Sequence, residues 1–437
     1  MSNSGGARVD EPDRGQVRLE VVALDMLVSE DHRARVVWAF VKQLELEELY
    51  GAIKARGEVG GRPAIDPRLL LALWLYGTLE NVGSARLLAR LCESDIGYRW
   101  LCGGVGVNYH SLADFRVSHG ALLDRLLTQT VAALCAEGMI SLDEVAVDGT
   151  KLQAAAGRGS FRGSEGLAGY ERAAAARVAR LKAEIESNPQ INEQRRRAAV
   201  ERAEREVAQR AAKARAVLEQ LKAEREKQAK THPKETAKKS EPKASTTDPQ
   251  ARVMRFADGG RRPAYNLQLG CVPQSDIIVE VMATDRRNDS GLALPMVERM
   301  AERFGAAPQR VLVDTKYATH ADIIALGERE AGSVEVYTPP SPESADATEE
   351  SRRKRKWHLQ HEPLVLQAWR ARMASEQGKT TMSRRRHIET VNGNLKNRGL
   401  GRLNVRGLVK VQCVALIHAL AHNLWRVHVL RQPALAT

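Results

Sequence analysis

The sequence of 437 residues predicts an α/β domain that follows an all-helical domain and is interrupted by a helical, coiled-coil-like hairpin. Three observations lead to this fold class. Helix-start signals and apolar runs fill the chain before residue 140. Strand-like runs begin near residue 144 and resume near residue 264. Between them lies an alanine-rich, charged segment with heptad spacing, which indicates an insertion within the α/β domain.

Composition points to a soluble protein with a polyanionic partner. Hydrophobic residues make up 43% and charged residues 28%, as is typical of globular proteins. Lysine and arginine number 67 against 54 acidic residues, which gives a net charge of +13. Such a balance favours nucleic acid or an acidic membrane surface as partner. Aromatic residues are only 4%, which argues against single-strand binding through base stacking.

Targeting signals are absent from the sequence pattern. The tail at 1–17 is polar and lacks the apolar stretch of a secretory signal. The five cysteines are scattered and include no Cys-x-x-Cys pair, so neither a disulfide framework nor a structural zinc site is indicated. The long apolar run near the C-terminus contains His418, His422 and Asn423. We therefore expect a reduced, cytoplasmic, nucleoid-associated protein with no membrane partner.

The first predicted domain spans 18–140 and is all-helical. Asp66 is placed to cap a helix with Pro67 in its first turn, and a second helix follows Ser84. Several of these short helices carry arginines, namely Arg86, Arg90, Arg99 and Arg116. Two interpretations remain open, a module that binds DNA ends and an ordinary helical domain with solvated arginines.

The insertion spans 161–245 and is predicted to be a basic helical hairpin with a linker. Residues 171–240 hold 19 basic and 11 acidic residues. Apolar side chains repeat at heptad spacing on both sides of a break at Ser187-Asn188-Pro189, and the second seam includes Val200, Val207 and Leu218. The hairpin is either a solvated arm or one that grips DNA phosphates or a second subunit.

The α/β domain comprises 141–160 and 246–437. We predict strands at 145–150, 264–269, 276–281, 310–314 and 334–336, a helix at 291–304 and a polar loop at 341–357. The first strand is expected to end at Asp148 and the fourth at Asp314. Side chains that face a ligand collect at strand ends in α/β sheets, so both aspartates are candidate site residues.

A probable helix at 383–396 supplies the third candidate. Arg385, Glu389 and Lys396 share one of its faces. Phosphodiester cleavage without a covalent enzyme intermediate uses two divalent ions, which carboxylates hold, while arginine and lysine hold the phosphates. The basic run Arg352, Arg353, Lys354, Arg355 and Lys356 is either a phosphate clamp or a flexible loop.

Blocks that occur in order along the chain resemble the DDE transposases of bacterial insertion sequences, in the branch with a Tyr-x2-Arg-x3-Glu-x6-Lys signature. The resemblance runs from about residue 18 to 427. Its motifs are Gly61 to Arg68, Leu75-Tyr76-Gly77, Ser84-Ala85-Arg86, Arg99-Trp100-Leu101, Phe115-Arg116, Val147 to Lys151, Thr247 to Met254, Tyr265 to Gln268, Thr284, Asp289-Ser290-Gly291, Ile388 to Gly393, Val405 to Val411 and Ala421 to Leu424.

The resemblance implies a ribonuclease-H-like core that nicks the ends of a mobile element and joins the freed 3′-hydroxyl to target DNA. Asp148, Asp314 and Glu389 would be catalytic and would bind two Mg²⁺ ions, for which Mn²⁺ can substitute. DNA contacts are expected from Arg385, Lys396, Lys151, Asn392 and the basic run at 352–356. The partners would be double-stranded DNA, both terminal inverted repeats and target, and further copies of the chain, most simply in a dimer.

Two positions depart from the family pattern. Lys316 replaces a glycine after the second aspartate, and lysine adopts a positive φ less readily, so we expect a different turn. Met382 replaces the tyrosine of the signature. An alternative function therefore stays open, that of an inactive or repurposed DNA-binding or assembly protein derived from a transposase.

Overall fold

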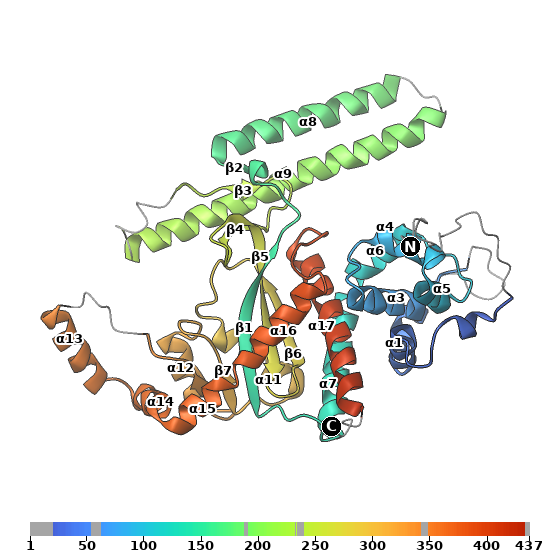
Figure 1. Cartoon of the computed structure of the whole chain (residues 1–437). Coiled ribbons are helices and arrows are strands. Elements are labelled where there is room, and N and C mark those ends of the chain that lie inside the picture. The colour runs from blue at the N-terminus through green and yellow to red at the C-terminus, as the bar shows by residue number, and fades with distance from the viewer. Residues whose placement is uncertain are drawn as a thin grey trace, which may run out of the picture.

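The computed structural model describes residues 21–53, 63–187, 191–231, 233, 240–341 and 348–432. The predicted tail at 1–17 lies outside this part of the chain. Figure 1 shows an N-terminal helical region, a region built around a sheet and a long helical hairpin that extends over one end of the sheet. The mixed helix and sheet architecture and the helical N-terminal region agree with the predicted fold class.

The N-terminal helices surround one buried helix, α3 (Pro67–Leu79). Every residue of α3 except Arg68 is buried. Asp66 accepts a hydrogen bond from the backbone N–H of Arg68, and Ser84 caps the next helix, so both predicted helix starts are confirmed. The other elements are η1 (Leu24–Leu27), α1 (Arg33–Lys42), α2 (Glu47–Gly51), α4 (Ala85–Ser94), α5 (Ile96–Cys102), α6 (Tyr109–Ser118) and α7 (Gly120–Ala136).

The central sheet is mixed. Its strands are β1 (Glu144–Gln153), β4 (Arg252–Arg255), β5 (Arg261–Val272), β6 (Ile277–Thr284), β7 (Arg310–Leu312) and β8 (Glu335–Tyr337). They follow the order β4-β5-β1-β7-β8, and β6 also pairs with β5. β1 is antiparallel to β5 and parallel to β7, and β7 is parallel to β8. Each predicted strand is present, although most boundaries differ.

The first strand is longer than predicted, and Asp148 does not end it. β1 continues to Gln153, and Asp148 lies in its middle, opposite Leu269 of β5. The glycine at 149 was taken as a turn signal. Its backbone instead belongs to an eight-residue antiparallel pairing with β5, a strand more than a hundred residues away, which overrides the local preference of glycine for turns.

The sheet region also contains further helices, and one of them replaces a predicted loop. They are α11 (Ala293–Phe304), α12 (His320–Gly327), α13 (Glu349–Gln360), α14 (Leu364–Ala374), α15 (Glu376–Ser383) and α16 (Arg386–Asn397). The polar loop predicted at 341–357 was wrong from residue 349 onward, because the basic run belongs to α13. Two acidic residues in the first turn, Glu349 and Glu350, complement the helix dipole there.

The insertion forms a two-helix hairpin, as predicted. α8 (Ser164–Ser187) and α9 (Ile191–Thr231) pack on each other, and the turn at 188–190 lies outside the described residues. The buried part of the seam is at the base, where Leu167, Ala214 and Leu218 pack with Ala244. Val200, predicted in the seam, is 47% exposed, whereas β3 packs on α9 at the base of the hairpin.

A short two-stranded ladder ties the hairpin to the sheet region. β2 (Phe161–Arg162) pairs with β3 (Ala244–Ser245), so the two ends of the insertion lie side by side. The hydroxyls of Ser160 and Ser245 are 2.7 Å apart and add a side-chain hydrogen bond. The base of the hairpin therefore lies close to β1, which precedes β2 in the chain, and to β4, which follows β3.

Helix α17 (Leu408–Arg431) joins the N-terminal helices to the sheet by packing on α3, α6, α7 and β6. Within the described residues it is the one helix long and apolar enough to cross a membrane, but 67% of its apolar window is buried inside the protein. His418 is 8% exposed and His422 is fully buried, so both histidines are core residues. The Nε2 atom of His422 lies 2.8 Å from the backbone oxygen of Asp276.

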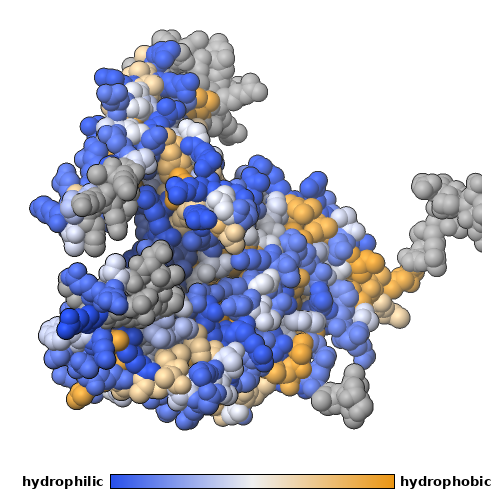
Figure 2. All heavy atoms as spheres, turned by 60° about the vertical axis from the view of Figure 1, so that its left-hand side comes forward, coloured by the Kyte–Doolittle hydropathy of each residue, from blue (hydrophilic) through white to orange (hydrophobic). Residues whose placement is uncertain are grey.

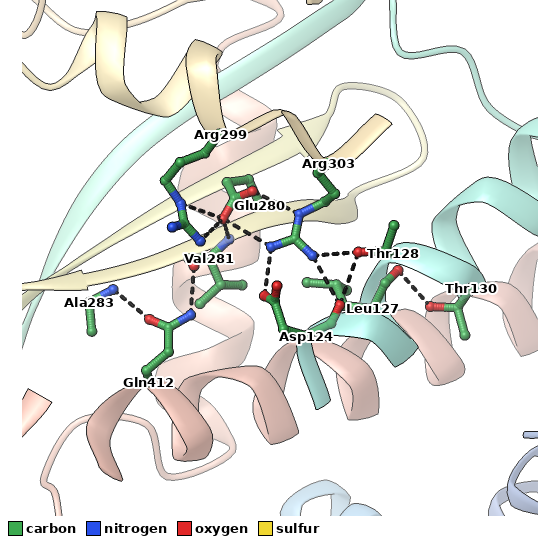
Figure 3. A network of polar contacts seen from close by, with 10 residues as sticks. All are labelled: Asp124, Leu127, Thr128, Thr130, Glu280, Val281, Ala283, Arg299, Arg303 and Gln412. Carbon is green, nitrogen blue, oxygen red and sulfur yellow. Dashed lines mark hydrogen bonds and ion pairs between the residues drawn. The ribbon is translucent and has the colours of Figure 1, made fainter. Parts of the chain in front are cut away.

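A buried ionic network makes a second connection between the same two regions (Figure 3). Glu280 of β6 has no exposed surface, and its carboxylate accepts hydrogen bonds from Arg299 and Arg303 of α11, each at 2.8 Å. Arg303 also bonds Asp124 at 2.6 Å and Thr128 at 2.7 Å, both in α7. One guanidinium thus spans the boundary between the helical region and the sheet.

Candidate active site

Three carboxylates from distant parts of the chain converge beside the sheet. The parallel register pairs Ala146 of β1 with Leu312 of β7. Asp148 and Asp314 each lie two residues beyond that pair, so the register brings them to neighbouring positions. Glu389 stands in the first turn of α16, a helix that packs on β1 and β5. Sequence spacing alone could not show this convergence, because it depends on strand pairing.

The guanidinium of Arg385 lies at the centre of these carboxylates. Its distances are 2.8 Å to Glu389, 3.3 Å to Asp148 and 4.0 Å to Asp314. The Arg385 side chain is 12% exposed, while those of Asp314 and Glu389 are both 62% exposed. Sequence analysis predicted a DNA contact for Arg385. In the structure this arginine supplies the positive charge that lets the carboxylates approach one another, and its DNA contact stays a prediction.

The arrangement does not form a ready-made metal cage. Across the described ranges, no group of three or more His, Cys, Asp or Glu side chains stands close enough to hold one ion. The carboxylates are spaced around the guanidinium, which occupies the place of a cation. Their donor atoms are all carboxylate oxygens, the ligands that hard divalent cations prefer, so the residues fit a magnesium site once Arg385 moves aside.

Asn392 lies on α16, one turn beyond Glu389, and reaches the deepest of the three acids. It donates a hydrogen bond from Nδ2 to Asp148 Oδ2 at 3.0 Å and is only 7% exposed. Asn392 was predicted to contact DNA; the structure places its amide against the Asp148 carboxylate, and the DNA contact stays a prediction. Burial raises the pKa of Asp148, and Arg385 opposes that shift by favouring the charged form.

A fourth carboxylate, Asp289, stands next to this site. Its Oδ1 accepts hydrogen bonds from Asn266 at 2.6 Å and from Gln268 at 2.8 Å. Gln268 in turn accepts a hydrogen bond from the hydroxyl of Tyr317 at 2.5 Å. A side chain at Gly149 would collide with Asp289, which explains the glycine in the middle of β1. The sequence carried one signal for this network, namely two polar residues in an otherwise apolar stretch of β5.

Two family models match the chain. The transposase DDE domain matches residues 229–424, and the transposase domain of unknown function numbered 772 matches residues 22–118. The chain belongs to the insertion-sequence DDE transposases. The two matches fall on the sheet region and on the N-terminal helices, on either side of most of the insertion. The branch with the Tyr-Arg-Glu-Lys signature stays a prediction.

Comparison of the transposase with curated proteins and with solved structures gave no match. The range matched by the DDE model includes Asp314 and Glu389, but it begins after Asp148. The hairpin separates Asp148 from the matched range in the sequence. In the folded transposase, the pairing of β1 with β7 nevertheless brings Asp148 close to the other two acids.

The remaining predicted DNA contacts lie at different depths. Lys396 is exposed in the last turn of α16, and Lys151 is half-buried in β1. Arg353 and Lys356 are exposed on α13, which Figure 1 shows at the outer edge beyond α12 and α14. The side chains of the other members of the basic run, Arg352, Lys354 and Arg355, lie outside the described residues. The DNA-contact roles of Lys151, Lys396 and the run remain predictions.

Both departures from the family pattern lie close to the site. Lys316 has a φ of 69°, in the left-handed region that glycine favours, so the turn after Asp314 takes the conformation that a glycine would adopt. The different turn that we expected from the lysine is not observed. Met382 packs against the hydrophobic core in place of a signature tyrosine.

Proposed function

We propose that this transposase is a metal-dependent DNA nuclease and strand transferase. It would hydrolyse a phosphodiester at each end of its mobile element and join the freed 3′-hydroxyl to target DNA. Asp148, Asp314 and Glu389 would hold two Mg²⁺ ions, with Mn²⁺ as a substitute. The observation that carries the proposal is that one guanidinium, that of Arg385, lies within ion-pairing reach of all three acids.

The site residues have separate tasks under this proposal. Bound divalent ions would supply activation of the attacking oxygen and stabilisation of the leaving oxygen. Asn392 fixes the orientation of the Asp148 carboxylate through its hydrogen bond. Arg385, once displaced from the acids, is placed at the start of α16 to bind a phosphate with its planar guanidinium. Lys396 stands about three turns further along the same helix and adds a second charge for the DNA backbone.

The wider fold supports the same function. A mixed sheet with acids near its central strands is compatible with a ribonuclease-H-like core. Two element ends must be cut and held together, so we propose a homo-oligomer, most simply a dimer. A DNA substrate also places the protein at the nucleoid. The net charge of +13 favours association with DNA over a broad surface.

The decisive experiment compares two Asp→Asn variants on DNA that carries the inverted repeats flanking the coding region. Asp148→Asn should bind these ends but fail to cut them in Mg²⁺, because it loses one ligand charge at the site. Asp143→Asn is the matched control, since Asp143 is exposed and hydrogen-bonds Gln309 outside the site. Undiminished cutting by Asp148→Asn would refute the assignment.

The alternative is a DNA-binding or assembly protein that has lost catalysis. Two observations favour it, Met382 in place of tyrosine and Lys316 in place of glycine. Such a protein binds DNA equally well with and without divalent ions and cuts nothing. Cleavage by the wild type that appears only with Mg²⁺ or Mn²⁺ excludes this alternative.

A further inference from the structure

A groove of about 800 Å³ lies between the hairpin and the sheet region. One wall is the C-terminal part of α9, around residues 221–228. The other wall consists of the returning segment at 240–243, the start of β4 and β5, and the loop at 285–288. Figure 2 shows this side of the molecule hollowed beneath the hairpin, with hydrophilic residues around the hollow.

The groove carries an excess of positive charge. Its lining includes seven basic and three acidic residues, a net charge of +4. One of the acids, Asp285, is already neutralised by Arg252, whose Nη2 lies 2.6 Å from its carboxylate. Five exposed cations in the lining have no ion pair among the described residues, and these are Lys227, Lys243, Arg261, Arg286 and Arg287. Partial desolvation of the Arg287 guanidinium lowers its pKa, and Arg252 adds to this effect, while Glu224 and Asp285 oppose it.

The walls of the groove are held in place rather than free to spread. Arg225 of α9 donates a hydrogen bond to the backbone oxygen of Ser240 at 3.2 Å, across the groove. The β2–β3 ladder and the packing of Leu218 on Ala244 fix the base of α9. The cations therefore form a preorganised row, which lowers the entropic cost of binding a polyanion.

One rim of the groove is close in the chain to the candidate active site. The loop that supplies Arg286 and Arg287 continues directly to Asp289, whose side chain packs over Gly149, the neighbour of Asp148 in β1. The groove therefore shares a loop with the surroundings of Asp148. Phe161 is the one aromatic residue in the lining, so the groove has no series of rings on which successive bases could stack, and a duplex is favoured over a single strand.

We propose that this groove binds the phosphate backbone of duplex DNA next to the cleavage site, so that the hairpin is a clamp for flanking DNA. This inference rests on the proposed function, since it assumes a DNA substrate. It adds a site that the catalytic residues do not include, and it assigns the insertion a role in holding substrate rather than only in assembly.

The test uses the full-length protein and a duplex of about 40 base pairs in EDTA, where no cleavage occurs. The groove variant combines Lys227→Gln, Lys243→Gln and Arg287→Gln. The control variant removes the same charge from exposed hairpin positions outside the groove, through Arg172→Gln, Arg180→Gln and Lys213→Gln. Circular dichroism and thermal unfolding establish that both variants are folded.

The groove variant should bind at least about tenfold more weakly at moderate salt. Its plot of log K against log salt should lose about 2–3 units of slope, because each lost phosphate contact removes about 0.9. The control variant should stay within about twofold of the wild type. The difference in affinity between the groove variant and the control variant should be much smaller for a single strand of the same length than for the duplex.

Three outcomes overturn the inference in different ways. Equal losses of DNA affinity in the groove variant and the control variant would mean that DNA binds by diffuse electrostatic attraction and not at a site in the groove. A larger loss of affinity for single strands than for the duplex would mean that the groove binds single-stranded DNA, which contradicts this proposal. A wild type that binds DNA without salt dependence would overturn the proposed function as well, whereas the first two outcomes leave it intact.

Discussion

The guanidinium of Arg385 lies 2.8 Å from the carboxylate of Glu389, one helical turn further along the chain. The same group reaches Asp148 at 3.3 Å. A side chain in this position satisfies the acids electrostatically and also competes with any cation for them. Under the proposed function, a divalent ion at these acids would have to displace the guanidinium, and a DNA phosphate would attract the displaced arginine.

Replacing this arginine gives the first prediction. Arg385→Gln should bind Mn²⁺ more tightly than the wild type in the absence of DNA, because a competing charge is gone. Titration followed by electron paramagnetic resonance of free Mn²⁺ measures the affinity without any catalysis. Arg384→Gln is the control, since Arg384 pairs with Glu144 instead of the site acids. Equal or weaker Mn²⁺ binding by Arg385→Gln would contradict the competition.

The second prediction concerns the network in Figure 3. Glu280→Gln should lower the free energy of unfolding by about 3–5 kcal/mol, because Arg303 would remain buried without its main counter-charge. Urea unfolding monitored by circular dichroism measures the change. Glu298→Gln, an exposed change on α11, should have an effect below about 0.5 kcal/mol. Similar values for the two variants would mean that the network does not stabilise the boundary between α7 and the sheet.

The third prediction concerns pH. Burial lowers the pKa of His418 to about 3 and that of His422 to about 4, from an ordinary value of 6.5. In the unfolded chain both rings take up protons below pH 6.5, and in the folded protein they do not. The unfolded state thus binds more protons, and stability falls as the pH drops from 6.5 toward 4.

At pH 5 His418 alone lowers the free energy of unfolding by about 2 kcal/mol relative to neutral pH. His418→Leu should therefore lose about 2 kcal/mol less stability than the wild type between pH 7.5 and pH 5. Guanidinium unfolding at the two pH values gives this difference directly. The exposed His110 provides the control, and His110→Leu should behave as the wild type does. An unchanged pH dependence in His418→Leu would show that the ring is protonated in the folded protein.

Local patterns in the sequence predicted most elements of the fold. Caps such as Asp66 and heptad positions such as Leu218 depend on neighbours within a few turns, and the structure confirms both. The extent of β1 was not predictable in this way, because Gly149 is held in the strand by its pairing with β5 and by the Asp289 side chain above it. Helix α13, which contains the basic run, was not predicted, because a run of like charges suggested a loop.

The candidate site was predictable in its members and not in its contacts. Asp148, Asp314 and Glu389 came from motif order and chemistry, and their metal-binding role remains to be tested. The central position of Arg385 and the burial of Asn392 depend on how α16 packs on β1. No spacing rule within 383–396 contains that packing, so the hydrogen bond between Asn392 and Asp148 could not be predicted from the sequence.

The paired ends of the insertion have a consequence for how this family can vary. Because Phe161 lies opposite Ser245, the polypeptide leaves and rejoins the catalytic region at almost one point. Whole heptads can be gained or lost from α8 and α9 together without moving either strand of that ladder. Such a change would alter the length of the arm and leave the point where it joins the sheet region in place.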